Sequence, residues 1–315
     1  MAERIDRPEI YEAARRFVDA GLRRDDSLFT PGEPIWSAAG AADLYVRFVD
    51  HPDESADSFL NTFQRQLDGA PAATVQLAAE VLFVHLLMPW DMRGNTKRGM
   101  IEAVLSWSPS PARIPDYLRD ALDVGVARLG AGHTLRNYQL QFLLELLRHW
   151  KSLPSDEQIR LLGDPWEFKG EVARTPGRQD QAQREALLHL MYPDTFEPIV
   201  SRSHKYRIAD YFADRADRSG EDVDLRLMRI RDSLAGDHAP NFSFYDPGIR
   251  ERWDGSAPTP LVVPPVLPPT PPVPRVATLA SLADELYVAP AFLEEIDGLL
   301  RDKGADAVLG RLEPG

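Results

Sequence analysis

The sequence contains no cysteine among its 315 residues. This absence excludes a thiol nucleophile, a disulfide framework and a zinc site with cysteine ligands, and it is typical of a cytosolic protein. Long hydrophobic runs are missing too: the longest, VLFVHLLM at 81–88, is much shorter than the about 20 residues that a membrane-spanning helix needs. The polar start MAERIDRPEIYEAARR lacks the apolar stretch of a signal peptide. We therefore expect a cytoplasmic protein with no membrane partner.

Motifs of nucleotide-dependent and metal-dependent enzymes are absent as well. The sequence holds no G-x-x-x-x-G-K-[ST] phosphate loop, no G-x-G-x-x-G turn, no G-x-S-x-G elbow and no H-E-x-x-H pair. Its seven histidines are scattered singly, whereas a zinc site needs about three or four ligands that converge. The sequence therefore predicts no catalytic residue, no metal site and no cofactor, and favours a protein that acts by binding.

Positive charge is in the minority. The chain has 36 Lys and Arg against 49 Asp and Glu, which gives a formal net charge of −13. Because nucleic acid would repel such a chain as a whole, binding to it would need a local basic face. The alternative interpretation is that the acidic balance only keeps the protein in solution.

Apolar residues recur at helical spacing up to about residue 236, and no convincing alternating strand pattern appears. The first stripe consists of Ile10, Ala13, Phe17 and Ala20. Further helices are predicted near 41–50, 56–68, 71–88, 97–107, 115–129, 134–151, 155–162, 165–174, 179–191 and 221–235. The fold class is therefore all-α. The chain length suggests about two domains, and we expect an N-terminal helical domain at 1–155 and a second helical subdomain at 156–254.

The composition changes sharply at Gly255. Residues 256–275 read SAPTPLVVPPVLPPTPPVPR, with nine prolines and one charge. Because proline fixes φ and removes a backbone donor, we expect an extended linker at 255–276. The alternative is a docking ligand for an SH3-like partner. Helical periodicity resumes at 277–304, which predicts a short helical pair, and an irregular tail follows at 305–315.

One stretch, LLHLMYPDTFEPIVSRSHKYRIADYFAD at 187–214, concentrates aromatic and basic residues. Asp194 followed by Glu197 has the spacing of a capping box, which predicts the end of one helix and a short turn. Phe196 and Ile199 are then expected to fill the corner between two helices, with Phe196 buried and structural.

The same stretch holds the densest run of positive charge. Ser201 or Ser203 is the expected cap of the next helix, and Arg207 is expected to pair with Asp210 at i, i+3. One interpretation is a solvated helix start, on which Lys205 contributes little to stability. The other is a contact site for nucleic acid or a partner. The candidate contact residues are Arg202, His204, Lys205 and Arg207, with Arg15, Arg16, Arg23 and Arg24 as additional phosphate contacts.

These residues also carry a family resemblance. YPDTFEPIVSRSHK at 192–205 resembles a segment in the N-terminal regions of McrB-like AAA+ proteins of bacterial restriction and defence systems. Four further pieces agree in order and content: HLLMPWDMRGNTKRGMIEAVLSW at 85–107, DPWEFKGEV at 164–172, FSFYDPGIRERW at 242–253 and LADELYVAPAFLEEIDGLLRDKG at 282–304. The resemblance covers roughly residues 85–304.

The resemblance implies the part of such a protein that precedes the motor. In the family the last piece leads into a strand and a GPPGTGKT loop, whereas this chain continues with ADAVLGRLEPG at 305–315. The chain is then a recognition or regulatory arm that binds DNA or a partner protein, without hydrolysing nucleotide itself. Its implied partners are an AAA+ motor, in the same or a separate chain, and a McrC-like nuclease.

We expect that a frameshift or a premature stop cuts the chain before the motor, or that a separate chain supplies the motor in a split system. Two other hypotheses stay open. One is an enzyme with an unrecognised active site in the helical body, and the other is an adaptor that docks through its proline-rich segment.

Overall fold

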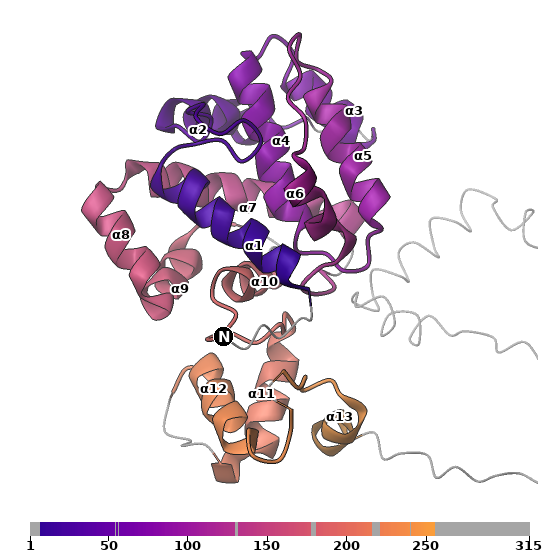
Figure 1. Cartoon of the computed structure of the whole chain (residues 1–315), viewed down its shortest axis with the longest axis vertical. Coiled ribbons are helices and arrows are strands. Elements are labelled where there is room, and N and C mark those ends of the chain that lie inside the picture. The colour runs from indigo at the N-terminus through magenta and orange to yellow at the C-terminus, as the bar shows by residue number, and fades with distance from the viewer. Residues whose placement is uncertain are drawn as a thin grey trace, which may run out of the picture. The chain divides into compact units, whose positions relative to one another are not determined.

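The computed structural model describes residues 7–53, 55, 57–129, 132–177, 181–215, 221–239 and 241–255. This described part contains thirteen α-helices and no β-strand, which confirms the all-α prediction for it (Figure 1). The predicted helical pair at 277–304 and the tail at 305–315 lie outside the described residues, as does the predicted linker beyond Gly255.

The helices follow one another with short connections. In chain order they are α1 (Pro8–Arg16), α2 (Ala38–Tyr45), α3 (Phe59–Gln66), α4 (Ala72–Leu86), α5 (Gly94–Leu105), α6 (Asp116–Arg119), α7 (Gly132–Ser152), α8 (Ser155–Gly163), α9 (Pro165–Arg174), α10 (Gln181–Met191), α11 (Arg202–Tyr211), α12 (Val223–Leu234) and α13 (Pro247–Asp254). Two π-helical segments, η1 (Phe17–Arg23) and η2 (Val46–Asp50), continue α1 and α2. Two 3₁₀ segments, η3 (Asp120–Asp123) and η4 (Ala213–Arg215), follow α6 and α11.

Helix α4 lies at the centre of the larger hydrophobic cluster, in contact with α2, α5 and α7 (Figure 1). Its side chains are apolar on almost every face, a pattern typical of a helix that is buried all round. Leu77, Leu82 and Phe83 are accordingly inaccessible to solvent. The stripe predicted in the first helix is confirmed, since Ile10, Ala13, Phe17 and Ala20 are all buried in this cluster.

The helix predicted at 115–129 is only partly present, because helical structure ends at Asp123. Beyond it the chain runs beside residues 88–90, with the amide of Val126 donating to Met88 O at 2.8 Å. Gly125 makes this close approach sterically allowed, since an added Cβ would lie 2.3 Å from Pro89 O. Backbone pairing to a distant segment therefore replaces the last turns of the predicted helix.

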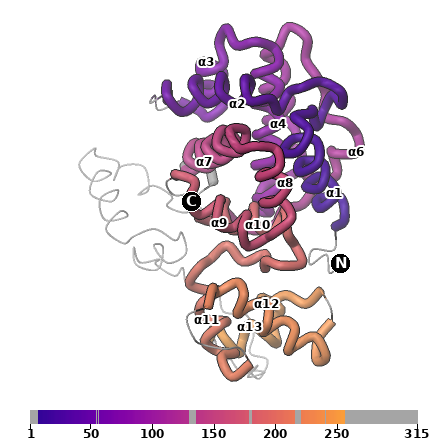
Figure 2. The backbone as a smooth tube through the Cα atoms, turned by 90° about the vertical axis from the view of Figure 1, so that its left-hand side faces the viewer, coloured from indigo at the N-terminus to yellow at the C-terminus, as the bar shows by residue number. Residues whose placement is uncertain are grey.

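A second, smaller hydrophobic cluster begins a few residues after the first one ends. The larger cluster runs from Ile10 to Phe196, and the smaller one from Ile199 to Trp253. The smaller cluster is formed mainly by α11, α12 and α13, which form a separate group of helices in both views (Figures 1 and 2). The division into 1–155 and 156–254 stays a prediction, and the larger cluster continues across residue 155.

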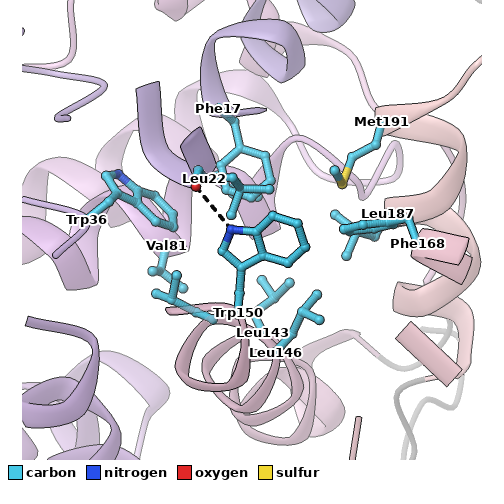
Figure 3. A pocket seen from close by; sticks show the side chains of 12 residues that line it. Phe17, Leu22, Trp36, Val81, Leu143, Leu146, Trp150, Phe168, Leu187 and Met191 are labelled. Atoms are coloured by element: carbon cyan, nitrogen blue, oxygen red, sulfur yellow. Dashed lines mark hydrogen bonds between the residues drawn. The ribbon is translucent and has the colours of Figure 1, made fainter. Parts of the chain in front are cut away.

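A small apolar cavity of about 20 Å³ lies inside the larger cluster, beside Trp150 (Figure 3). The indole Nε1 of Trp150 donates a hydrogen bond to the carbonyl of Leu22 at 3.0 Å. The surrounding side chains, among them Phe17, Leu143 and Leu187, are apolar. A space of this size holds about one water at most, and an apolar lining gives that water no partner. The cavity is therefore a packing gap in the core.

The corner residue Phe196 gives a test of the packing. It is 0% exposed, and its ring meets those of Trp166 and Tyr192 edge to face at centroid distances of 5.3 and 6.3 Å. We expect Phe196→Ala to lower the free energy of unfolding by about 3–5 kcal/mol, measured by urea denaturation. The control Tyr206→Ala, at a side chain that is 49% exposed, should stay within about 0.5 kcal/mol of the wild type. Equal losses in the two variants would contradict this packing.

Candidate functional site

The start of α11 is capped as the sequence predicts, but the turn before it is held differently. The Ser201 hydroxyl accepts a hydrogen bond from the amide of His204 at 3.3 Å, which makes Ser201 the N-cap. Helix α10 ends at Met191 and a turn follows at 193–195, which confirms the predicted helix end and short turn, although no helix begins at Asp194. The Glu197 carboxylate is instead buried against α12.

The partner of Glu197 is Arg231, which lies 34 residues further along the chain. Arg231 donates from Nε and Nη2 to the two carboxylate oxygens at 2.5 and 2.7 Å. Its Nη2 also donates to the carbonyl of Phe242 at 2.8 Å, and its guanidinium lies 4.0 Å from the centre of the Phe242 ring. This buried, bidentate ion pair joins the turn that contains Glu197 to α12.

Lys205 is the largest departure from the sequence-based expectation. Its side chain is 1% exposed, so the prediction of a solvated lysine is wrong. The ammonium Nζ donates to Asp224 Oδ1 on α12 at 2.6 Å and also to a carboxylate oxygen of Glu185 on α10. The physical reason is that a buried ammonium is stable only when carboxylates compensate its charge, and two do so here.

A second lysine extends this arrangement into a buried ion network. Lys169 on α9 donates to Asp224 Oδ2 at 2.6 Å and to Asp222 Oδ1 at 2.5 Å. Asp224 therefore bridges Lys169 and Lys205, and the network joins four helices. Burial alone would raise the pKa of Asp224, but the charges of Lys205 and Lys169 outweigh it and hold that pKa below its ordinary value.

His204 and Arg202 do not extend Lys205 into a basic surface. Arg202 is 63% exposed and its Nε lies 4.0 Å from a Glu185 carboxylate oxygen. His204 is partly buried, with Nδ1 3.0 Å from the hydroxyl of Tyr245. Burial, together with the positive charges of nearby arginines, holds the pKa of His204 below its ordinary value, so its imidazole is neutral near pH 7.

Arg207 is compensated by an acidic residue at the end of α13. Its Nη2 lies 2.8 Å from Asp254 Oδ1 and donates to the Asp254 carbonyl at 2.6 Å. Asp210, the predicted partner of Arg207, pairs instead with Arg226 at 3.0 Å, so that prediction is wrong. Of the four candidate side chains on α11, only that of Arg202 is more than half exposed to solvent.

Two of the four additional arginines pair with a neighbour on their own helix. Arg15 and Arg16 both contact the carboxylate of Glu12, at 3.2 and 3.0 Å. Arg16 also lies over the ring of Tyr117 at 4.5 Å from its centre. These exposed contacts are typical of a solvated helix face.

The other two, Arg23 and Arg24, line an open pocket of about 240 Å³. The pocket forms where η1 ends, α7 ends and α8 begins, and we call it the Arg23–Arg24 pocket. Its lining consists of Arg23, Arg24, Asp25, Ala38, Lys151, Leu153, Ser155 and Gln158.

Lys151 joins two of the segments that line the pocket. Its buried Nζ donates to the carbonyl of Gly21 at 2.7 Å and to Asp25 Oδ1 at 2.5 Å. Asp25 has a positive φ of 59°, a conformation that aspartate tolerates better than most residues. An added Cβ at Gly21 would lie 3.0 Å from the Trp36 ring, so the absence of a side chain lets η1 pack closely. Because Lys151 binds Gly21 and Asp25, it holds the segment between them, which carries both arginines.

The charges in the pocket are not equally compensated. Arg24 donates to Asp19 Oδ2 at 2.6 Å, and Lys151 is paired with Asp25. No hydrogen bond or ion pair to another described residue holds the exposed guanidinium of Arg23. A planar guanidinium with free donors beside a polar hollow suits a carboxylate or a phosphate group. Both arginines were candidates from the sequence, but no sequence pattern indicates that Lys151 and Gln158 line the same pocket.

In comparisons with known proteins, no protein-family model, no curated protein and no solved structure matches this chain. Within the described residues, no group of three or more His, Asp or Glu side chains is placed to hold a metal ion. No helix in that part of the chain is long and apolar enough to cross a membrane. The Arg23–Arg24 pocket is the candidate functional site because it places an uncompensated guanidinium beside a polar hollow.

The buried ion network predicts a large difference between two neighbouring basic residues. We expect Lys205→Met to lower the free energy of unfolding by about 3–5 kcal/mol, because it leaves buried carboxylates without their counterion. The matched variant Arg202→Met, on the exposed side of the same helix, should change it by no more than about 0.5 kcal/mol. Urea denaturation of both variants measures the difference. If Lys205→Met hardly changes the free energy of unfolding, the ion network is not buried.

The lowered pKa of Asp224 also predicts how the stability depends on pH. Its stabilising contribution is fully present above the ordinary carboxyl pKa of 3.8 and is lost as the pH falls below that value towards the folded-state pKa. We expect Asp224→Asn to be clearly less stable than the wild type at pH 7, and the gap to narrow below about pH 4. Urea denaturation at the two pH values tests this. If the difference in stability between Asp224→Asn and the wild type is the same at both pH values, Asp224 is not charged in the folded protein.

Proposed function

We propose that this chain is the non-catalytic recognition arm of a McrB-like AAA+ defence NTPase, acting in the cytoplasm by binding a protein partner. The observation that carries the proposal is where the helical body ends. Helix α13 stops at Asp254, and Gly255 takes the left-handed conformation with φ 66° that commonly ends a helix. The proline-rich sequence begins with the next residue. A folded body next to such a sequence is the arrangement of a tethered binding module.

The Arg23–Arg24 pocket is the surface that we assign to the partner. Its volume of about 240 Å³ suits a single acidic side chain or phosphate group. A duplex would need a continuous basic face, and the candidate face on α11 has Lys205 buried and Arg207 paired with Asp254. The net charge of −13 also opposes nucleic acid as the main ligand. We therefore favour an acidic group on a protein.

The family resemblance supplies the identity of that protein. The proposed partner is an AAA+ motor, as a domain of the same protein or as a separate chain, with a McrC-like nuclease in the same assembly. The first experiment reads the DNA downstream of the Gly315 codon together with the neighbouring genes. We expect a strand followed by a GPPGTGKT-like loop in one of them. If no reading frame there encodes such a loop, the assignment to a McrB-like system is wrong.

The second experiment measures binding of the full chain to that motor by calorimetry. We expect Arg23→Gln to weaken binding by about 10–100-fold, because a hydrogen bond to a charged group contributes about 1.5–3 kcal/mol. The same variant should keep the wild-type melting temperature, since no described residue relies on Arg23 for a hydrogen bond. Arg15→Gln, which removes an exposed arginine paired with Glu12, is the matched control.

Two outcomes would contradict the proposed contact. The first is an affinity for the motor that Arg23→Gln leaves unchanged. The second is tight binding to duplex DNA with an affinity that falls steeply with salt, by a slope of about −0.9 for each phosphate contact. The second outcome would assign the pocket to nucleic acid.

A further inference from the structure

A cluster of polar side chains is buried inside the helical body, away from the Arg23–Arg24 pocket. It takes one or more residues from each of α4, α5, α7 and α10. Its members are His85, Lys97, Arg136, Gln139 and Gln183, of which Arg136 is the most exposed, at 7%. Such residues are buried only when hydrogen bonds and opposite charges compensate them.

The contacts within the cluster fix the two amide groups. His85 Nδ1 lies 2.9 Å from Gln183 Oε1, and Gln139 Nε2 donates to the carbonyl of Leu129 at 3.4 Å. These contacts leave Gln183 Nε2 as a donor and Gln139 Oε1 as an acceptor, and neither has a hydrogen-bond partner among the described residues. Arg136 Nε is buried without a partner as well. Two donors and one acceptor of these buried side chains therefore lack partners in the described part of the chain.

The charge of Arg136 is not neutralised by any described residue. No described carboxylate forms an ion pair with it, and burial lowers its pKa with no offsetting acidic group. Its guanidinium lies 5.1 Å from the centre of the Phe59 ring, an attraction that gives it no negative charge. An arginine stays protonated in proteins. The positive charge is therefore present in the core and needs a counterion.

The neighbours of Arg136 do not offset its charge. Lys97 donates from Nζ to the carbonyl of Val124 at 2.5 Å, and burial lowers its pKa to about 8 although the charges of Asp91 and Asp123 act in the opposite direction. Burial and the positive charges of Arg136 and Lys97 lower the pKa of His85 to about 3, so this imidazole is neutral near pH 7. Neither Lys97 nor His85 thus supplies a negative charge to Arg136.

We propose that this cluster binds a small inorganic anion, with Arg136 Nε and Gln183 Nε2 as donors to it. A buried water would satisfy hydrogen bonds but would leave the guanidinium without a counterion. A monatomic anion such as chloride needs the least space among buried side chains, so we assign the site to an ion of that kind. Gln139 Oε1 is an acceptor, so in this proposal it accepts a hydrogen bond from a water that lies beside the anion. The anion is a structural ligand of the folded body, which is distinct from the partner contact at Arg23.

The test compares thermal unfolding of the full chain in chloride and in gluconate at the same ionic strength. Gluconate is too large to enter the cluster. We expect the midpoint to rise with chloride in a saturable manner, reaching about 5–10 °C when chloride exceeds its Kd about a hundredfold. A crystal soaked in bromide should show an anomalous peak within hydrogen-bond distance of Arg136 and Gln183.

Two variants separate the anion from general salt effects. Gln183→Glu keeps the shape of the side chain and supplies a negative charge within the cluster, so the midpoint should no longer depend on chloride. Arg136→Met removes the positive charge and should abolish the dependence in the same way. Gln64→Glu, which adds the same charge on the exposed side of α3, should leave it intact. Arg23→Gln should also leave it intact, which separates this proposal from the proposed function.

The proposal is overturned by either of two results. One is a wild-type midpoint that is the same in chloride and gluconate, with no bromide peak in the cluster. The other is a chloride dependence that persists in Gln183→Glu and in Arg136→Met. Either result would mean that water alone occupies the cluster.

Discussion

The carboxylate of Asp224 is the constraint on which the arrangement of the helices depends. It accepts hydrogen bonds from Lys205 and Lys169 at 2.6 Å each, so it joins α9, α11 and α12 through one buried group. The two hydrophobic clusters are thus connected by charged contacts as well as by the chain between Phe196 and Ile199. Apolar contacts tolerate small shifts of the helices, whereas the hydrogen bonds of a buried ion network form only at particular distances and angles. The network therefore joins α9 and α10, which belong to the larger cluster, to α11 and α12 of the smaller one.

The sequence predicted most helices, because amphipathic spacing records which positions face the core. Phe196, the N-cap Ser201 and the stripe of Ile10 are examples whose local pattern was sufficient. Lys205 was mispredicted for the same reason, since helical spacing does not tell which basic residue meets a distant acid. Its partners Glu185 and Asp224 lie 20 and 19 residues away. The end of the helix predicted at 115–129 was likewise decided by a distant segment.

The candidate site was only half predictable. The sequence shows where arginines are, but it does not show whether an acidic side chain compensates each of them. Arg16 and Arg207 are compensated by Glu12 and Asp254, and neither is left free to bind an anion. Arg23 has no such partner among the described residues. A run of basic residues is therefore weaker evidence for a binding surface than one uncompensated arginine beside a hollow.

Arg23 and Arg136 are both arginines without an acidic partner in the described part of the chain, yet their positions give them opposite roles. The guanidinium of Arg23 is hydrated, so the protein folds without a ligand there, and an anionic partner has only to displace water. The guanidinium of Arg136 is buried, and its unpaired charge opposes folding until a counterion neutralises it. An anion at Arg136 is consequently linked to the folding equilibrium. An anion at Arg23 can bind and leave a protein that is already folded, which is what recognition of a partner requires.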